Sequence, residues 1–162
     1  MSNPLHGDIP PEEFRKAAHD VVDWIADYLE QPAHPVRSAV APGDIRASLP
    51  QSPPQDGEPI DAILNDFHDK LLPGITHWNH PSFFAYFAIS GSYPGILGEM
   101  LTAALNVNGM LWATSPTVTE LEQLTLDWLR QMLGMNAGWF GEITDTASVS
   151  TFYALAAARE AV

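Results

Sequence analysis

The sequence contains no cysteine, which excludes disulfide bonds, thiolate zinc sites and cysteine nucleophiles. This absence is consistent with a reducing compartment, and we expect a cytoplasmic protein. No stretch approaches the roughly 18 apolar residues that a membrane-spanning helix needs. Residues 1–11 have neither a basic nor an apolar region, so we expect no signal peptide there.

Basic residues are scarce: the chain has 7 Lys and Arg against 20 Asp and Glu, a net charge of −13. Nucleic-acid binding requires clusters of basic side chains, and the only adjacent pair is Arg15-Lys16. The acidic balance also disfavours binding to anionic membrane surfaces. We therefore expect neither nucleic acid nor membrane as a partner.

Several common catalytic signatures are missing. The chain has no Gly-x-Ser-x-Gly motif, no phosphate-binding P-loop and no dinucleotide fingerprint. His77 and His80 could share a metal ion only on a helix, and Pro81 follows them immediately. No carboxylate follows them at the spacing of a zinc-protease motif. We expect no metal site.

The chain does contain 46% apolar and 10% aromatic residues in 162, a globular composition of single-domain size. Residues 32–59 hold seven of the 14 prolines and are predicted to be an extended connection. Ser115 and either Asp145 or Thr146 are expected N-caps, and Gly134 is an expected helix stop. Helical spacing of apolar residues predicts a mostly α chain with helices at 11–30, 60–72, 91–106, 116–133 and 147 to the end.

The last predicted helix carries no stop signal at Ala161-Val162. Many apolar helices and only one or two candidate strands are poorly suited to a self-contained core. We therefore expect a piece of a larger protein, or one chain of an intimate assembly.

The turn Asp145-Thr146-Ala147-Ser148 precedes an Ala-rich apolar run. Such a turn presents backbone N–H groups, small hydroxyls and the positive end of a helix dipole, which suit a phosphate. The alternative is that Asp145 or Thr146 simply caps the helix. From these residues alone both interpretations stay open.

A second informative segment runs from Trp78 to Phe87 and is rich in aromatic residues. It could line a pocket for a flat, apolar group, or it could be ordinary core. An extended backbone would place its side chains on alternating faces, so that one side could not bury them all. Residues 82–87 could form a short strand or an extended loop.

Several short segments follow one another in a distinctive order. They are Glu13-Phe14-Arg15, Asp23 to Tyr28, Pro73 to Trp78, Pro81 to Phe87, Ser92-Tyr93-Pro94, Trp112 to Pro116, Thr119 to Glu122, Asp127-Trp128-Leu129, Asp145 to Ser148 and Ala156 to Arg159. In this order they resemble the group II pyridoxal-phosphate (PLP) decarboxylases, in particular the aromatic-L-amino-acid branch that acts on DOPA, tyrosine or tryptophan. The resemblance covers nearly the whole chain.

The resemblance implies the PLP-dependent transferase fold of type I. Residues 1–85 would form an N-terminal helical arm that includes the proline-rich traverse 32–59. Residues 86–162 would begin the α/β large domain that binds PLP. The family is a two-fold homodimer with active sites at the interface, and its arm packs on the partner subunit. This chain would supply the N-terminal third of such a subunit.

Site residues carry over from the resemblance position by position. Thr146, Ala147 and Ser148 correspond to residues that hold the cofactor phosphate. Asn108 and Met110 correspond to positions that reach into the neighbouring subunit's active site. The pocket for the substrate's aromatic ring corresponds to Trp78, Tyr86, Phe87, Ala88 and Ile89.

Two of these positions depart from the family pattern. Many aromatic decarboxylases have Pro-Thr where this chain has Ala88-Ile89, and Ile89 cannot donate the threonine's hydrogen bond. Met110 stands where an aromatic residue is common in the family, which implies a more flexible wall of the substrate pocket. Both departures leave the preferred aromatic substrate open.

The implied activity is decarboxylation of an aromatic L-amino acid to the amine and CO2 by the full-length dimer. No catalytic residue can be assigned in this chain, because Lys16 and Lys70 do not match the motif of the family's cofactor-binding lysine. We expect the isolated chain to be inactive. A related aldehyde synthase is one alternative. A non-catalytic helical interaction or dimerisation module is an alternative of a different class.

Overall fold

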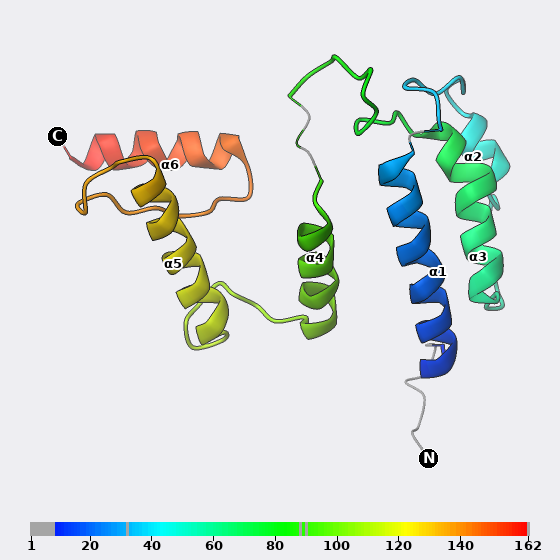
Figure 1. The fold of residues 1–162 in the computed structure, drawn as a ribbon, viewed down its shortest axis with the longest axis horizontal. Coiled ribbons are helices and arrows are strands. Elements are labelled where there is room, and N and C mark those ends of the chain that lie inside the picture. Colours follow the sequence, from blue (N-terminus) through cyan, green and yellow to red (C-terminus); the bar gives the residue numbers. More distant parts are fainter. Residues whose placement is uncertain (1–8, 32, 88, 90, 162) are drawn as a thin grey trace. The chain divides into compact units, whose positions relative to one another are not determined.

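The computed structural model describes residues 9–31, 33–87, 89 and 91–161. They form two compact units that divide between Ser92 and Tyr93, and each unit is described by itself. No β-strand occurs in the described part of either unit, so the mostly α prediction is confirmed for these residues (Figure 1). The boundary at residues 85 and 86 between arm and large domain is a functional assignment and stays a prediction.

The first unit is built on α1, Pro11–Glu30, which begins and ends where the sequence predicts. Pro11 needs no hydrogen-bond acceptor in the first turn, and the acidic Glu12 and Glu13 complement the positive end of the helix dipole. Trp24 joins this helix to the next helical segment, because its ring meets that of Phe67 edge-on with centroids 5.2 Å apart. Aromatic contacts therefore hold the unit together.

The second predicted helix is present, although its geometry changes along its length. It begins as α3, Ile60–Asp66, continues as a π-helical turn, Phe67–Leu71, and ends in a 3₁₀ turn, Leu72–Gly74. Lys16 of α1 lies 3.5 Å from the Asp61 carboxylate, and the two helices run alongside each other (Figure 1). The helix ends at the predicted Pro73-Gly74 stop.

The proline-rich connection contains a short helix that the sequence does not predict, α2, Asp44–Ser48. Gly43 precedes it with φ at +101°, a conformation that favours glycine, and the Asp44 carboxylate accepts the Ala41 N–H at 2.7 Å. These local bonds begin a helical turn without any long apolar period. The connection is tied back to the end of the second helical segment, because the Ser38 hydroxyl donates to the Pro73 carbonyl at 2.9 Å.

The second unit contains the three remaining predicted helices. They are α4, Tyr93–Leu105, α5, Pro116–Met132, and α6, Ala147–Glu160. Ser115 holds the expected N-cap position of α5 and is buried, but its side chain makes no capping hydrogen bond. Gly134 follows α5 with φ at +68°, as expected of a glycine that ends a helix.

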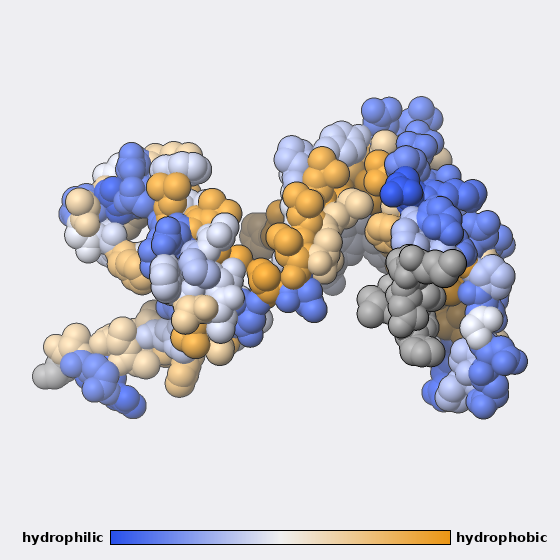
Figure 2. Space-filling model, turned by 90° about the horizontal axis from the view of Figure 1, so that it is seen from below, coloured by the Kyte–Doolittle hydropathy of each residue, from blue (hydrophilic) through white to orange (hydrophobic). Residues whose placement is uncertain are grey.

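The helices of the second unit have no buried residue within the described part of the chain. Apolar side chains gather along α4, where Leu97, Leu101 and Leu105 are exposed (Figure 2). Continuous apolar surface of this kind is typical of a face that meets another protein surface. None of the helices described is both long and apolar enough to cross a bilayer.

Gly134 gives a test of the α5 terminus. Replacing Gly134 by Ala forces a side chain into the left-handed region, and we expect about 1 kcal/mol lower unfolding free energy. Replacing Gly98, which lies within α4 with open space where a Cβ would stand, should instead raise stability by up to about 1 kcal/mol. Urea unfolding of both variants measures the difference. Equal effects of the two substitutions would contradict the assigned helix end.

Candidate functional site

The predicted phosphate turn begins α6 with Thr146 as its N-cap. The Thr146 backbone is extended, and its side-chain Oγ1 accepts the Val149 N–H at 3.2 Å. The Thr144 hydroxyl donates to the Thr146 carbonyl at 3.2 Å, which fixes the approach to the helix. The capping interpretation of this turn is therefore confirmed for Thr146.

Capping does not use up the donors of this turn. The backbone N–H groups of Ala147 and Ser148 and the Ser148 hydroxyl have no hydrogen-bond partner among the described residues. The Thr146 hydroxyl accepts one bond and keeps its own proton available. Two amides and two hydroxyls at the positive end of a 14-residue helix are a donor set that fits a phosphate dianion.

The loop before this turn is fastened to α5 by polar side chains. The Glu122 carboxylate accepts the Ile143 N–H at 2.9 Å, three residues before the cap. Arg130 donates to the Met135 carbonyl at 2.8 Å and to the Asp127 carboxylate at 2.8 Å. The bond from Arg130 lowers the pKa of Asp127, which keeps this carboxylate ionised. These bonds set where the phosphate turn stands relative to α5.

Asn108 and Met110 lie in the connection between α4 and α5. The Asn108 side-chain oxygen accepts the Met110 N–H at 2.8 Å, and its backbone carbonyl accepts the Thr114 hydroxyl at 2.9 Å. Asn108 therefore shapes a turn, and Met110 projects from it with 77% of its surface exposed. A Cβ on Gly109 would collide with Val118 Cγ1, so the turn packs closely on α5. The cross-subunit role of both residues stays a prediction.

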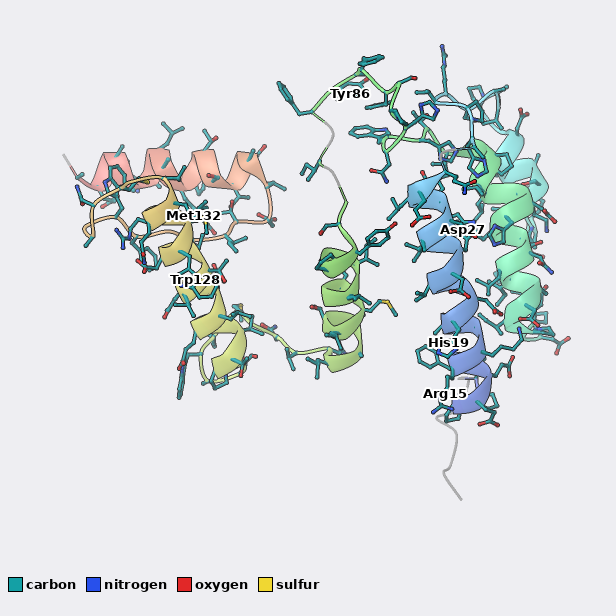
Figure 3. The ribbon with its side chains drawn as sticks, viewed as in Figure 1. Arg15, His19, Asp27, Tyr86, Trp128 and Met132 are labelled. Atoms are coloured by element: carbon teal, nitrogen blue, oxygen red, sulfur yellow. The ribbon has the colours of Figure 1, made fainter. Side chains whose placement is uncertain are left out.

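The aromatic segment is a loop rather than a strand in its described residues. The Trp78 ring is nearly parallel to that of Phe83, at 5.1 Å, and to that of Tyr86, at 5.5 Å. Tyr86 has φ at +57°, which is rare for an aromatic residue and costs about 1–3 kcal/mol. It is 81% exposed, and its side chain stands out from the loop (Figure 3). The stack is partly exposed among the described residues, and the pocket interpretation of this segment stays a prediction.

The structure does not bring all of the predicted pocket residues together. Trp78 and Tyr86 are in contact, whereas Phe87 and Ile89 are 100% and 91% exposed. Ala88 lies outside the described residues. The substrate role of all five positions stays a prediction.

Sequence reasoning missed a partly buried cluster at the start of this loop, with His77 at its centre. The Tyr28 hydroxyl and His77 Nδ1 are 2.8 Å apart, and the His34 ring stacks on that of His77 at 4.8 Å. His77 is only 3% exposed. Burial lowers its pKa, and repulsion from His34 and His80 lowers it further. Two features of the sequence could have pointed to this cluster. Tyr28 lies on the apolar face of its predicted helix, and His77 directly precedes Trp78.

The described part of the chain contains no group of three His, Asp or Glu side chains that could hold a metal ion. Both lysines are engaged in ion pairs on helix surfaces. Lys16 Nζ lies 2.9 Å from Asp20, whose hydrogen bond raises the lysine pKa, and Lys70 Nζ lies 2.6 Å from Asp66.

Comparison with known proteins identifies the family of the chain. The family model described as the pyridoxal-dependent decarboxylase conserved domain matches residues 42–162. The chain belongs to this family. The matched region includes the phosphate turn of α6, the Asn108 turn and the aromatic segment.

Individual relatives agree with the family assignment. Tyrosine decarboxylase 4 of Petroselinum crispum is 43% identical over 159 residues, which cover 94% of this chain and 31% of that protein. Phenylacetaldehyde synthase of Petunia hybrida is 49% identical over 128 residues, 78% of this chain and 25% of the relative. The crystal structure of Catharanthus roseus tryptophan decarboxylase in complex with L-tryptophan matches with a TM-score of 0.87 and 41% identity, covering 95% of this chain and 34% of that chain. The chain thus spans about a third or less of each relative.

Substitutions at Thr146 test the cap that shapes the phosphate turn. Replacing Thr146 by Val keeps the side-chain shape but removes the acceptor, and we expect about 1 kcal/mol lower stability and faster hydrogen exchange of the Val149 amide. Thr146→Ser retains the acceptor and should retain the protection. Protection of Val149 that is unchanged in Thr146→Val would mean that the cap is not formed in solution.

Proposed function

We propose that the protein containing this chain decarboxylates an aromatic L-amino acid to the amine and CO2 with PLP. The observation that carries the proposal is the unpaired donor set at the start of α6, in a family that depends on pyridoxal phosphate. The names of the tyrosine and tryptophan decarboxylases among the relatives support an aromatic substrate. The exposed stack of Trp78 and Tyr86 offers the flat, apolar surface that such a substrate requires.

In this proposal the chain holds the cofactor by its phosphate. The N–H groups of Ala147 and Ser148 and the hydroxyls of Thr146 and Ser148 donate to the phosphate oxygens. When bound, PLP supplies the electron-accepting ring that takes up the electron pair left as the bond between Cα and the carboxylate breaks. A phosphate fixed by four donors at a helix start orients that ring without the need for a cationic side chain.

The aromatic loop binds the substrate side chain. Trp78 and Tyr86 stack on each other, and the exposed outer side of this stack offers an apolar face to an aromatic ring. Ile89 has an apolar side chain and offers only apolar contact. Recognition by this loop therefore rests on ring stacking, which phenyl, phenol and indole rings all provide.

We further infer that the working form is a homodimer. The amphipathic α1 and the exposed apolar side chains along α4 are surfaces suited to a partner subunit. In this arrangement Asn108 and Met110 reach the neighbour's active site. The cytoplasmic location expected from the cysteine-free sequence stays a prediction.

Two other functions remain as outcomes of the test. The petunia aldehyde synthase is as similar to this chain as the decarboxylases are, which makes an aldehyde the first alternative product. A helical module that only binds a partner would show neither product.

The assay uses the full-length protein loaded with PLP, with tyrosine, DOPA and tryptophan as substrates and glutamate as the control. We expect CO2 and the corresponding aromatic amine. Aldehyde in place of amine would select the synthase, and no product together with no PLP binding would refute the proposal. A protein limited to residues 1–162 should give no turnover, because neither Lys16 nor Lys70 matches the motif of the family's cofactor-binding lysine.

Variants of the phosphate turn test the cofactor site itself. Ser148→Ala removes one donor to a charged phosphate and should weaken PLP binding about tenfold or more. Ser150→Ala is the matched control, because Ser150 is also an exposed serine of α6 but lies beyond the first residues of the helix. Equal PLP affinities of the two variants would contradict the assigned donors.

A further inference from the structure

His77 is the least exposed of the described residues, although it lies in a chain with very few buried side chains. A buried imidazole needs a polar partner, because an unpaired polar group away from water is costly. Its partner is the Tyr28 hydroxyl, 2.8 Å from Nδ1, near the end of α1. The small space beside the cluster, about 10 Å³, is too tight for a ligand, so the side chains pack directly.

Three segments of the first unit meet at this imidazole. Tyr28 comes from α1, and the His34 ring stacks on His77 with an interplanar angle of 14°. The His77 backbone N–H donates to the Val36 carbonyl at 3.0 Å. The residue is therefore held by its ring and by its backbone to the arm helix and to the segment that follows it.

The aromatic loop is built outward from His77. The His77 carbonyl accepts the His80 N–H at 3.1 Å, and the His80 carbonyl accepts the Phe83 N–H at 2.9 Å. Phe83 stacks on Trp78, the residue next to His77. Beyond this point Tyr86 and Phe87 are mostly or fully exposed, so the start of the loop is its firm attachment.

We propose that His77 is a positioning residue, whose hydrogen bond to Tyr28 fastens the aromatic loop, residues 78–87, to the arm helix. The arrangement of Trp78 and Tyr86 then depends on α1 in part through the His77 imidazole. The effect of this attachment on substrate binding rests on the proposed function of the loop. The attachment itself is independent of that function and can be measured without substrate.

The fastening requires the neutral imidazole. Burial raises the pKa of Tyr28, so its hydroxyl keeps its proton and donates it to Nδ1 of a His77 protonated on Nε2. The groups that face His77 are Tyr28 from α1, His34 from the following segment and His80 from the loop, and no carboxylate pairs with it among the described residues. A proton on His77 would meet no opposite charge there.

The direction of the pH dependence follows from these neighbours. The pKa of His77 lies below its ordinary value of 6.5, so the unfolded or detached segment binds a proton more readily than the attached one. The attachment is complete above about pH 6.5 and weakens as the pH falls toward the lowered pKa. An aromatic loop held only by stacking would show no such change.

The experiment measures amide hydrogen exchange of residues 78–83 in the full-length protein, corrected for intrinsic rates, between pH 5 and 8. Tyr28→Phe removes the hydroxyl but keeps the ring that stacks on Trp24. We expect exchange about fivefold faster at pH 7.5, the factor that an average hydrogen bond is worth. The wild-type protein should approach the rate of the variant as the pH falls. Tyr153→Phe, on exposed α6, is the control and should match the wild type.

The second measurement is of KM and kcat, by steady-state kinetics with an aromatic amino acid as substrate. A positioning role raises KM about fivefold in Tyr28→Phe and leaves kcat nearly unchanged. His77→Phe should give the same loss with exchange that no longer depends on pH. Unchanged exchange in Tyr28→Phe overturns the proposal whatever the activity. Faster exchange with an unchanged KM overturns the link to substrate, while the wild-type product assay decides the proposed function separately.

Discussion

Within the described residues the segments that carry the site are joined by a few directional bonds. Ala17 and Leu72 are the only buried apolar residues among those described, and each keeps 7% of its surface exposed. Where packing is sparse, each hydrogen bond between segments has a large share in fixing their arrangement. Tyr28 with His77 secures the aromatic loop, and Glu122 with Ile143 secures the approach to the phosphate turn. Each bond lies a few residues from the groups that the proposed function uses.

The electrostatics of the proposed phosphate turn follow from the scarcity of basic side chains in the chain. A chain with a net charge of −13 offers no basic cluster for a phosphate dianion, and Arg159 at the far end of α6 pairs with Glu160. In the proposed site the donors are instead backbone amides and hydroxyls at a helix start, whose dipole supplies a fixed partial positive charge. This arrangement is directional as well as attractive, so it can hold a cofactor in one orientation. Asp145 is the first residue of the turn, and its side chain is exposed among the described residues.

Helices with a long apolar period and clear end signals could be predicted closely from the sequence. The bounds of α1 agree, and those of α5 and α6 differ by only a residue or so at their ends. The five-residue α2 could not be predicted, because it begins at a glycine turn and at the bond from the Ala41 N–H to the Asp44 carboxylate, without any apolar period. The cap at Thr146 was among the predicted alternatives, whereas the partnership of Tyr28 and His77 joins residues 49 apart that no local pattern connects. The strained φ of Tyr86 likewise depends on ring stacking that only the folded loop provides.

The most direct measurement of the central claim is amide hydrogen exchange at residues 146–149 of the full-length protein, with and without PLP. If the α6 turn holds the cofactor phosphate, PLP should slow the exchange of the Ala147 and Ser148 amides. Pyridoxal, which lacks the phosphate, should leave them unprotected at the same occupancy. Equal exchange in all three samples, with PLP shown to be bound, would mean that this turn is only a helix cap and that the cofactor is held elsewhere.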